Sequence, residues 1–133
     1  MKKIGFINGC FDILHVGHIR MFKFAKEQCD ILIVGIDSDE RVSKLKGESR
    51  PINSQKDRKE VLLSLNCIDN VEIFNTSDEL RVLIKVIEPD IMVVGSDYRN
   101  KEVIGSENAK RLLFFERIEG YSTTKTAKNI GLG

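Results

Sequence analysis

Residues 31–36 read Ile-Leu-Ile-Val-Gly-Ile, a continuous apolar run made mostly of β-branched side chains. Such a run is typical of a strand that is buried on both faces, as strands are in a parallel sheet. Shorter apolar stretches predict four more strands, at residues 3–8, 71–74, 91–95 and 112–115. The sequence therefore predicts about five short strands spread along the chain.

Segments with apolar residues at helical spacing, or with turn and cap residues, separate these strands. Helices are predicted at 16–28, from a cap at Asp37 or Ser38 to 42, from Ser54 to 65, from a cap at Ser77 to the residues before Pro89, at 105–110 and at 122–130. Alternating strands and helices form βαβ units with right-handed crossovers. We expect an α/β fold, a Rossmann-like doubly wound sheet of about five parallel strands with helices on both faces. We expect it to form a single domain over residues 1–133.

The composition is that of a globular protein, with 41% hydrophobic and 31% charged residues in a chain of 133. No apolar run approaches the ~18 residues that a membrane-spanning helix needs, so no membrane partner is expected. The three cysteines, Cys10, Cys29 and Cys67, are widely spaced. This usage predicts a reduced, cytoplasmic protein. The net charge of +1 argues against a nucleic-acid partner.

Positive charge is concentrated between Arg41 and Lys59, where seven basic residues stand against two acidic ones. This local excess suggests a small polyanion, such as a nucleotide phosphate, although a solvated basic helix face would give the same pattern. In open α/β sheets, ligands bind beyond the carboxyl ends of the strands. Residues 44–53 come after the second predicted strand, so we expect them near the carboxyl ends of the strands, where such ligands bind.

The only two histidines of the chain, His15 and His18, fall together after the first predicted strand. Three residues apart at a helix start, their side chains project to the same side. Imidazolium donates from both nitrogens, Gly17 permits close approach of a bound group, and a helix N-terminus attracts anions. A zinc site would need further ligands at suitable spacing, which the chain lacks. We therefore expect phosphate binding rather than zinc or two ordinary surface histidines.

The roles of two residues close to these histidines, Asp12 and Cys10, stay open. Asp12 could form a salt bridge or a cap, hold substrate, order one of the histidines or help to position Mg²⁺. Cys10 could be reactive, but a small buried thiol is the more usual role for such a residue.

Residues 117–124 follow the fifth predicted strand and read Arg-Ile-Glu-Gly-Tyr-Ser-Thr-Thr. One hydroxyl suffices to cap a helix, so three in succession after Gly120 exceed what capping requires. Hydroxyls and helix amides would cradle phosphate, and Arg117 would add charge-assisted donors. Asp97, after the fourth predicted strand, could accept hydrogen bonds from a base amino group or a sugar hydroxyl, although Asp is also common in turns.

Together these segments resemble the two signatures of the cytidylyltransferase-like nucleotidyltransferases. The matching residues are Gly9-x-Phe11-Asp12-x-x-His15-x-Gly17-His18 and Arg117-x-x-Gly120-x-Ser122-Thr123-Thr124. The resemblance implies transfer of an NMP group from an NTP to a phosphorylated sugar or alditol, with release of pyrophosphate. It also implies Mg²⁺ bound with the NTP and a homodimer.

Two branches of this family compete. The run Lys46-Gly47-x-x-Arg50-Pro51-Ile52-Asn53 and the Tyr at 121 resemble the branch that transfers AMP from ATP to heptose 1-phosphate for lipopolysaccharide precursors. Glycerol-3-phosphate cytidylyltransferase, which uses CTP, has a similar length and both signatures. We expect the heptose branch, with a sugar phosphate such as D-glycero-D-manno-heptose 1-phosphate as acceptor. A non-catalytic nucleotide-binding regulator is the alternative of another class; it would need the phosphate cradle but not Lys46.

The resemblance also implies a role for each matching residue. Those expected to act in catalysis are His15, His18, Lys46 and Arg117. Those expected to bind the nucleotide are Gly9, Cys10, Phe11, Asp12, Gly17, Lys44, Asp97, Gly120, Ser122 and Thr123. Arg50 and Arg58 are expected to lie near the acceptor or to support the loop that holds it. The sequence assigns no metal ligand.

Overall fold

The computed structural model describes residues 1–116, and the last predicted helix lies outside this part of the chain. The elements are β1 (Ile4–Gly9), α1 (Val16–Glu27), β2 (Ile31–Asp37), α2 (Asp39–Lys46), α3 (Gln55–Leu63), β3 (Asn70–Phe74), α4 (Ser77–Ile87), β4 (Ile91–Gly95), the 3₁₀ turns η1 (Ser96–Tyr98) and η2 (Ser106–Asn108), and β5 (Arg111–Phe115). All five predicted strands are present.

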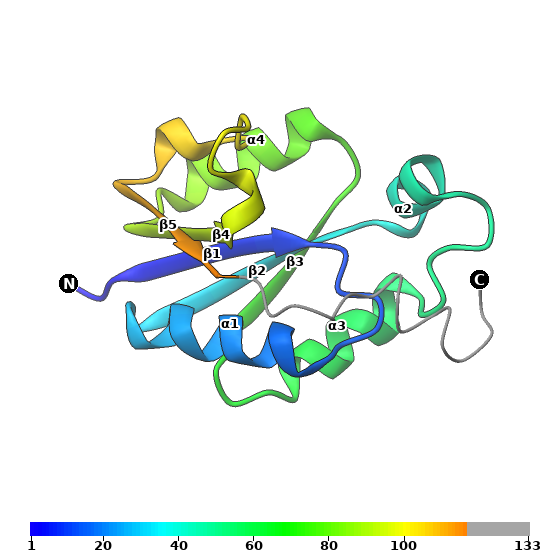
Figure 1. Cartoon of the computed structure of the whole chain (residues 1–133), viewed down its shortest axis with the longest axis horizontal. Coiled ribbons are helices and arrows are strands. Elements are labelled where there is room, and N and C mark those ends of the chain that lie inside the picture. The colour runs from blue at the N-terminus through cyan, green and yellow to red at the C-terminus, as the bar shows by residue number, and fades with distance from the viewer. Residues whose placement is uncertain (117–133) are drawn as a thin grey trace.

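The strands form one parallel sheet in the order β3-β2-β1-β4-β5 (Figure 1). β1 lies at its centre because its side chains can be buried on both faces. Phe6 and Ile7 are 0% and 1% exposed, and they belong to different hydrophobic clusters on the two sides of the sheet. The order reverses beside β1, which is where ligands bind in such sheets.

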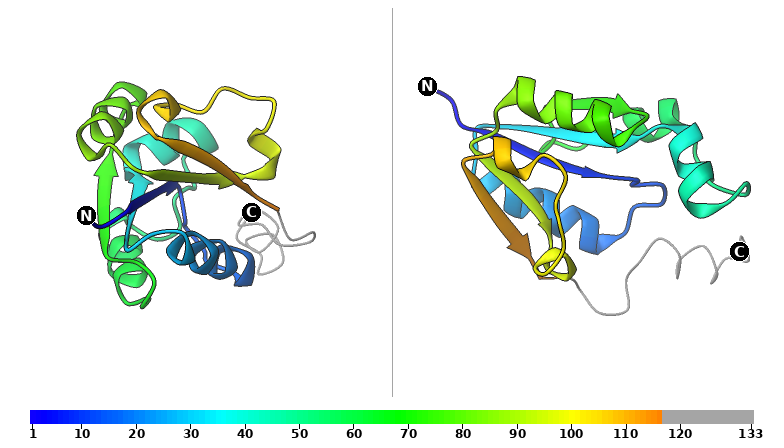
Figure 2. Two further views of the ribbon diagram at one scale, coloured as in Figure 1. Left: turned by 90° about the vertical axis from the view of Figure 1, so that its left-hand side faces the viewer. Right: turned by 90° about the horizontal axis from the view of Figure 1, so that it is seen from above.

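Helices cover both faces of the sheet (Figure 2). On one face, Phe22 of α1 and Leu62 of α3 pack with Ile7 in one cluster. On the other face, Leu80 and Ile84 of α4 pack in a second cluster. The expected α/β class, with helices on both faces of a five-stranded parallel sheet, is confirmed.

Some element boundaries differ from the sequence-based expectation. The predicted cap of α4 at Ser77 is wrong. Thr76 caps this helix, since its hydroxyl accepts from the amide of Glu79, and the Glu79 carboxylate accepts from the amide of Thr76. α2 continues beyond residue 42 to Lys46 and ends at Gly47, whose φ of +108° suits glycine. The predicted helix at 105–110 is only the turn η2.

Within residues 1–116, no helix is long and apolar enough to cross a membrane. That residues 1–133 form a single domain stays a prediction.

Candidate functional site

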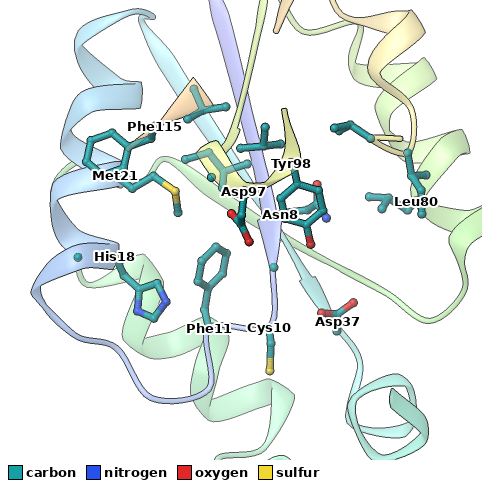
Figure 3. A pocket seen from close by; sticks show the side chains of 18 of the residues that line it. Asn8, Cys10, Phe11, His18, Met21, Asp37, Leu80, Asp97, Tyr98 and Phe115 are labelled. Carbon is teal, nitrogen blue, oxygen red and sulfur yellow. The ribbon is translucent and has the colours of Figure 1, made fainter. Parts of the chain in front are cut away.

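A cleft of about 520 Å³ opens at the carboxyl ends of the central strands (Figure 3). Asn8 and Gly9 of β1 line its middle. His18 lies on the α1 side of this cleft, and Lys46 lines it from α2. The cleft occupies the edge of the sheet at which the sequence places its candidate residues.

The two histidines form an unusual capping box at the start of α1. Nδ1 of His15 accepts from the amide of Gly17 at 3.1 Å, and Nδ1 of His18 accepts from the amide of His15 at 3.2 Å. The rings stack with centroids 3.9 Å apart. An accepting Nδ1 carries no proton, so this geometry calls for neutral rings with the proton on Nε2. The doubly donating imidazolium expected from the sequence does not fit these two caps.

Phe11 holds the ring of His18 from the side. Phe11 has a φ of +50°, a left-handed conformation that bulky residues rarely adopt and that typically costs about 1–3 kcal/mol. Its buried ring meets His18 edge-on at 5.5 Å and Phe22 at 5.0 Å. A Cβ atom at Gly9 would approach Cζ of Phe11 to 2.8 Å, so a glycine is needed there. In this left-handed conformation the Phe11 ring packs against the ring of His18 and helps to hold it in place.

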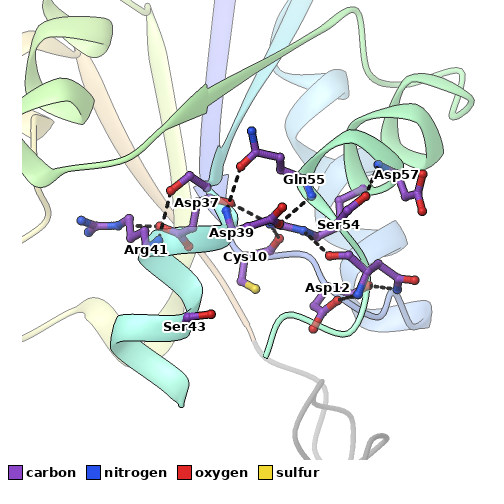
Figure 4. Close-up of polar contacts among 12 residues, drawn as sticks. Cys10, Asp12, Asp37, Asp39, Arg41, Ser43, Ser54, Gln55 and Asp57 are labelled. Carbon is purple, nitrogen blue, oxygen red and sulfur yellow. Dashed lines mark hydrogen bonds and ion pairs between the residues drawn. The ribbon is translucent and has the colours of Figure 1, made fainter. Parts of the chain in front are cut away.

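Asp12 ties the turn after β1 to the loop before α3 (Figure 4). Its carboxylate accepts from the amides of Ile52 at 2.7 Å and Asn53 at 2.8 Å, and from Nε of Arg50 at 3.3 Å. The side-chain amide of Asn53 donates back to the Asp12 carbonyl at 2.7 Å. The Asp12 side chain is 0% exposed and that of Arg50 is 5% exposed. Of the roles left open for Asp12, the structure supports the salt bridge.

Arg58 performs a similar structural task one turn into α3. Its guanidinium donates to the carbonyl oxygens of Asn53 at 3.0 Å, Cys10 at 2.9 Å and Asp37 at 2.8 Å, and to the carboxylate of Asp39 at 2.9 Å. The Arg58 side chain is 0% exposed. These contacts join the ends of β1 and β2 to the loop, which is the supporting role among the two expected for Arg58.

The sequence model of the cytidylyltransferase-like family matches residues 6–128. The chain belongs to this family. The family resemblance stated from the two signatures is thereby confirmed.

Several bacterial relatives of this cytidylyltransferase-like chain are bifunctional proteins named HldE. A protein from a Nitratiruptor species is 52% identical over 123 residues, and one from Helicobacter pylori is 51% identical over 129 residues. The matches cover 92% and 97% of this chain but 26% and 28% of the relatives. The chain thus spans about a quarter of the length of these relatives.

Solved structures show the same fold. The lipopolysaccharide core biosynthesis protein from Thermoplasma volcanium GSS1 matches with a TM-score of 0.71 and 24% identity, over 90% of this chain and 100% of that chain. The bifunctional NMN adenylyltransferase/ADP ribose pyrophosphatase from Francisella tularensis matches with a TM-score of 0.74 and 17% identity, over 97% of this chain and 42% of that one. Both likenesses support the Rossmann-like architecture of this cytidylyltransferase-like chain.

The cleft gathers many of the residues expected from the sequence. Those that line it are Gly9, Cys10, Phe11, His15, Gly17, His18, Lys46 and Asp97. Lys44 does not line the cleft. Its side chain is 72% exposed and pairs with Glu40 at 3.0 Å. Asp12, Arg50 and Arg58 lie behind the cleft as supports, and Arg117, Gly120, Ser122 and Thr123 lie outside the described residues.

The thiol of Cys10 is held in its protonated form. Burial raises its pKa, and this effect outweighs the opposing influence of Lys46 and Arg58. Cys10 lines the cleft, but its environment does not favour the thiolate that a nucleophile requires. The structure thus agrees with a small, largely buried thiol.

Sequence reasoning did not single out several residues that line the cleft. They are Asn8, Met21, Asp37, Arg41, Glu102 and Phe115. From the sequence, Arg41 is only one charge of the basic segment, and Asp37 is only a possible helix cap. A usable signal was the position of Asp37 directly after the apolar run of β2, at the carboxyl end of a parallel strand.

Proposed function

We propose that this chain transfers the NMP group of an NTP, with ATP favoured, to the phosphate of a sugar phosphate, giving an NDP-sugar and pyrophosphate. D-glycero-D-manno-heptose 1-phosphate is the acceptor that the sequence resemblance favours. The proposal is further supported by the name of the similar Thermoplasma protein, a lipopolysaccharide core biosynthesis protein.

The histidine capping box is the observation that carries the proposal. Because the helix amides engage both Nδ1 atoms, the proton of each neutral ring belongs on Nε2. Two imidazole N–H donors and a helix N-terminus at one end of a cleft form a binding place for phosphate oxygens. A protein that handles triphosphates needs such donors where charge develops during transfer.

The reaction needs one substitution at phosphorus. A phosphate oxygen of the acceptor attacks the α-phosphorus in line, a new P–O bond forms, and the bond to the β-phosphate oxygen breaks as pyrophosphate leaves. Catalysis then consists of positioning and charge stabilisation. His15 and His18 would donate to the triphosphate oxygens, and Lys46 would reduce the repulsion between the two anionic substrates.

Other residues would complete the site. Arg117 would balance charge on departing pyrophosphate, and Ser122 and Thr123 would hold the β- and γ-phosphates. Asp97 would face the base or the ribose. Arg50, Arg58 and Asp12 would act indirectly, by fixing the loop that precedes α3.

Mg²⁺ is part of the proposal as a partner of the NTP. Among residues 1–116, no three His, Cys, Asp or Glu side chains gather into a metal site, and the Asp12 carboxylate is engaged by the loop. In this proposal the ion would be held mainly by the phosphate oxygens of the NTP, whose charge it would neutralise. A homodimer and a cytoplasmic setting also belong to the proposal, and gel filtration tests the former.

The test is pyrophosphate release with Mg²⁺, for ATP and CTP, each with heptose 1-phosphate and with glycerol 3-phosphate. Release with ATP and heptose 1-phosphate alone is expected. Release with CTP and glycerol 3-phosphate alone would keep the transferase chemistry but overturn the favoured substrates. Binding of NTP without release from any pair would favour the regulator.

A variant tests the role of the histidines. His18→Ala is expected to fold and to lower kcat by about 10²–10³, which is typical for loss of one transition-state contact. Arg20→Ala, at an exposed position on the same helix, serves as the control and should keep wild-type turnover. Normal turnover in His18→Ala would remove His18 from the proposed machinery.

A further inference from the structure

Asp37, an acidic residue, lines the cleft, although both proposed substrates carry negative charge. It is the last residue of β2, and its carboxylate lies across the end of β1 from His18 (Figure 3). A carboxylate here would repel phosphate groups. Its presence therefore indicates that the part of the ligand beside it is neutral.

The Asp37 carboxylate is held in one orientation. Its Oδ1 accepts from Nε of Arg41 at 2.7 Å. Arg41 is itself fixed, because its Nη2 donates to Oγ of Ser77 at 3.3 Å and its guanidinium lies 5.3 Å from the centre of the Phe74 ring. Because the Asp37 and Arg41 side chains are already ordered, a ligand that binds them pays a smaller cost in side-chain entropy.

One oxygen of this carboxylate remains for a ligand. Among the described residues, no donor reaches Oδ2 of Asp37, and the side chain keeps 15% exposure at the cleft. Arg41 lines the same stretch of wall and is 17% exposed. A carboxylate oxygen next to a guanidinium offers an acceptor and donors side by side, which suits neighbouring hydroxyl groups of a sugar.

Different elements supply the donors for phosphate and the Asp37 carboxylate. The histidine pair of α1 supplies donors for phosphate at one side, and Lys46 supplies a cation at the end of α2. Asp37 and Lys46 line the same cleft as Cys10, which directly follows β1. A ligand whose phosphate meets Lys46 would thus carry its uncharged part past Asp37.

We propose that Asp37, positioned by Arg41, recognises hydroxyl groups of the acceptor and makes the site selective for a polyhydroxylated phosphate ester over a compact one. This inference rests on the proposed function, because it assumes that a sugar phosphate enters the cleft. It assigns Asp37 to specificity, and Arg41 to positioning.

The test measures binding by calorimetry, in the presence of Mg²⁺ and a non-hydrolysable ATP analogue. Wild type and Asp37→Asn are titrated with heptose 1-phosphate, glycerol 3-phosphate and inorganic phosphate, which share a phosphate but differ in their hydroxyls. Asp78→Asn, which removes an exposed carboxylate in the first turn of α4 away from the cleft, is the matched control. Pyrophosphate release by each protein is recorded separately.

The expected effect of Asp37→Asn differs between heptose 1-phosphate and inorganic phosphate. Asp37→Asn weakens heptose 1-phosphate about 10- to 100-fold, the usual effect of losing a hydrogen bond to a charged group. Inorganic phosphate binds equally well or more tightly, because a repulsive charge has gone. The control variant behaves as wild type with all three ligands.

Three results would overturn the inference. Asp37→Asn could weaken the binding of all three ligands equally, which would mark a purely structural role for Asp37. The other two results are an unchanged affinity of this variant for heptose 1-phosphate and a failure of the wild-type protein to bind heptose 1-phosphate. The proposed function is judged by the other readout. Binding that depends on Asp37 without pyrophosphate release would refute the transferase function and leave the recognition intact.

Discussion

Replacing Asp12 by Asn should destabilise the protein far more than such a conservative change usually does. The carboxylate accepts three hydrogen bonds, at 2.7, 2.8 and 3.3 Å, and its side chain is 0% exposed. An amide has one accepting oxygen, so its NH₂ group must face at least one donor whichever way it turns. Arg50, 5% exposed, also loses its charge partner.

The size of the effect follows from these losses. An orphaned buried donor costs about 1–3 kcal/mol, and breaking a buried ion pair by removing one partner costs about 3–5 kcal/mol. The two terms overlap at Asp12, so we expect a loss of about 3–5 kcal/mol in the free energy of unfolding. At roughly 4 °C per kcal/mol for a domain of this size, Tm should fall by about 12–20 °C.

Urea unfolding followed by circular dichroism measures this loss, with an unchanged m-value as the sign that only stability has changed. Asp30→Asn is the control, because its exposed carboxylate accepts a single amide hydrogen bond, from Lys3 at 2.7 Å. It should lose less than about 1 kcal/mol. A loss of that small size in Asp12→Asn would refute the idea that this carboxylate holds the loop.

Three further predictions concern single groups. Gly9→Ala should displace the Phe11 ring that packs against His18, because the new Cβ would lie 2.8 Å from Cζ of Phe11. Urea unfolding should show a loss of about 1–3 kcal/mol in the free energy of unfolding, and the pyrophosphate-release assay should show a lower kcat. A Gly9→Ala variant with wild-type activity would contradict this prediction. Burial raises the pKa of Cys10, so its alkylation by iodoacetamide should be slower than that of a free thiol at pH 7.5 and still be rising at pH 9, as peptide mass spectrometry can follow. The Ile4 amide, which donates to the Asp90 carboxylate at 2.8 Å, and then Lys110 lower the pKa of Asp90 below its ordinary value of 3.8. The Asp90 carboxylate therefore stabilises the fold fully above pH 3.8, and this stabilisation is lost as the pH falls through the lower pKa of the folded state. The difference in urea midpoint between wild type and Asp90→Asn should therefore shrink from pH 5 to pH 3, and a constant difference would argue against this role.

The parts of the fold that depend on local pattern could be predicted from the sequence. The apolar run at 31–36 gave β2, and the alternation of strands and helices gave the parallel sheet, because strand burial and helical spacing are visible in neighbouring residues. The cap of α4 also follows from a local pattern, Thr76-x-x-Glu79, which the prediction of Ser77 overlooks. Thr76 and Ser77 are both good caps, and what separates them is the reciprocal bond with Glu79.

Contacts between distant residues could not be predicted. Asp12 finds its partners about 40 residues later in the chain, and no local pattern relates the two segments. Arg58 looked like a ligand for an anion because it is basic, yet four acceptors surround it. Buried charges of this kind depend on groups that only the folded chain brings together. Asp37 differs, because its place at the carboxyl end of β2 can be predicted from the sequence, and only the contact of its partner Arg41 with Ser77 of α4 comes from the folded chain.

The spacing of the two histidines follows from the needs of the helix as much as from those of a ligand. A capping box joins the N-cap residue to the third residue of the helix, and these are His15 and His18. A glutamate at the second position would close the same box but would bring a negative charge to the site. Histidine accepts from the helix at Nδ1 and keeps a proton at Nε2. Under the proposed function, one side chain thus completes the helix at Nδ1 and would offer its Nε2 proton to a phosphate oxygen.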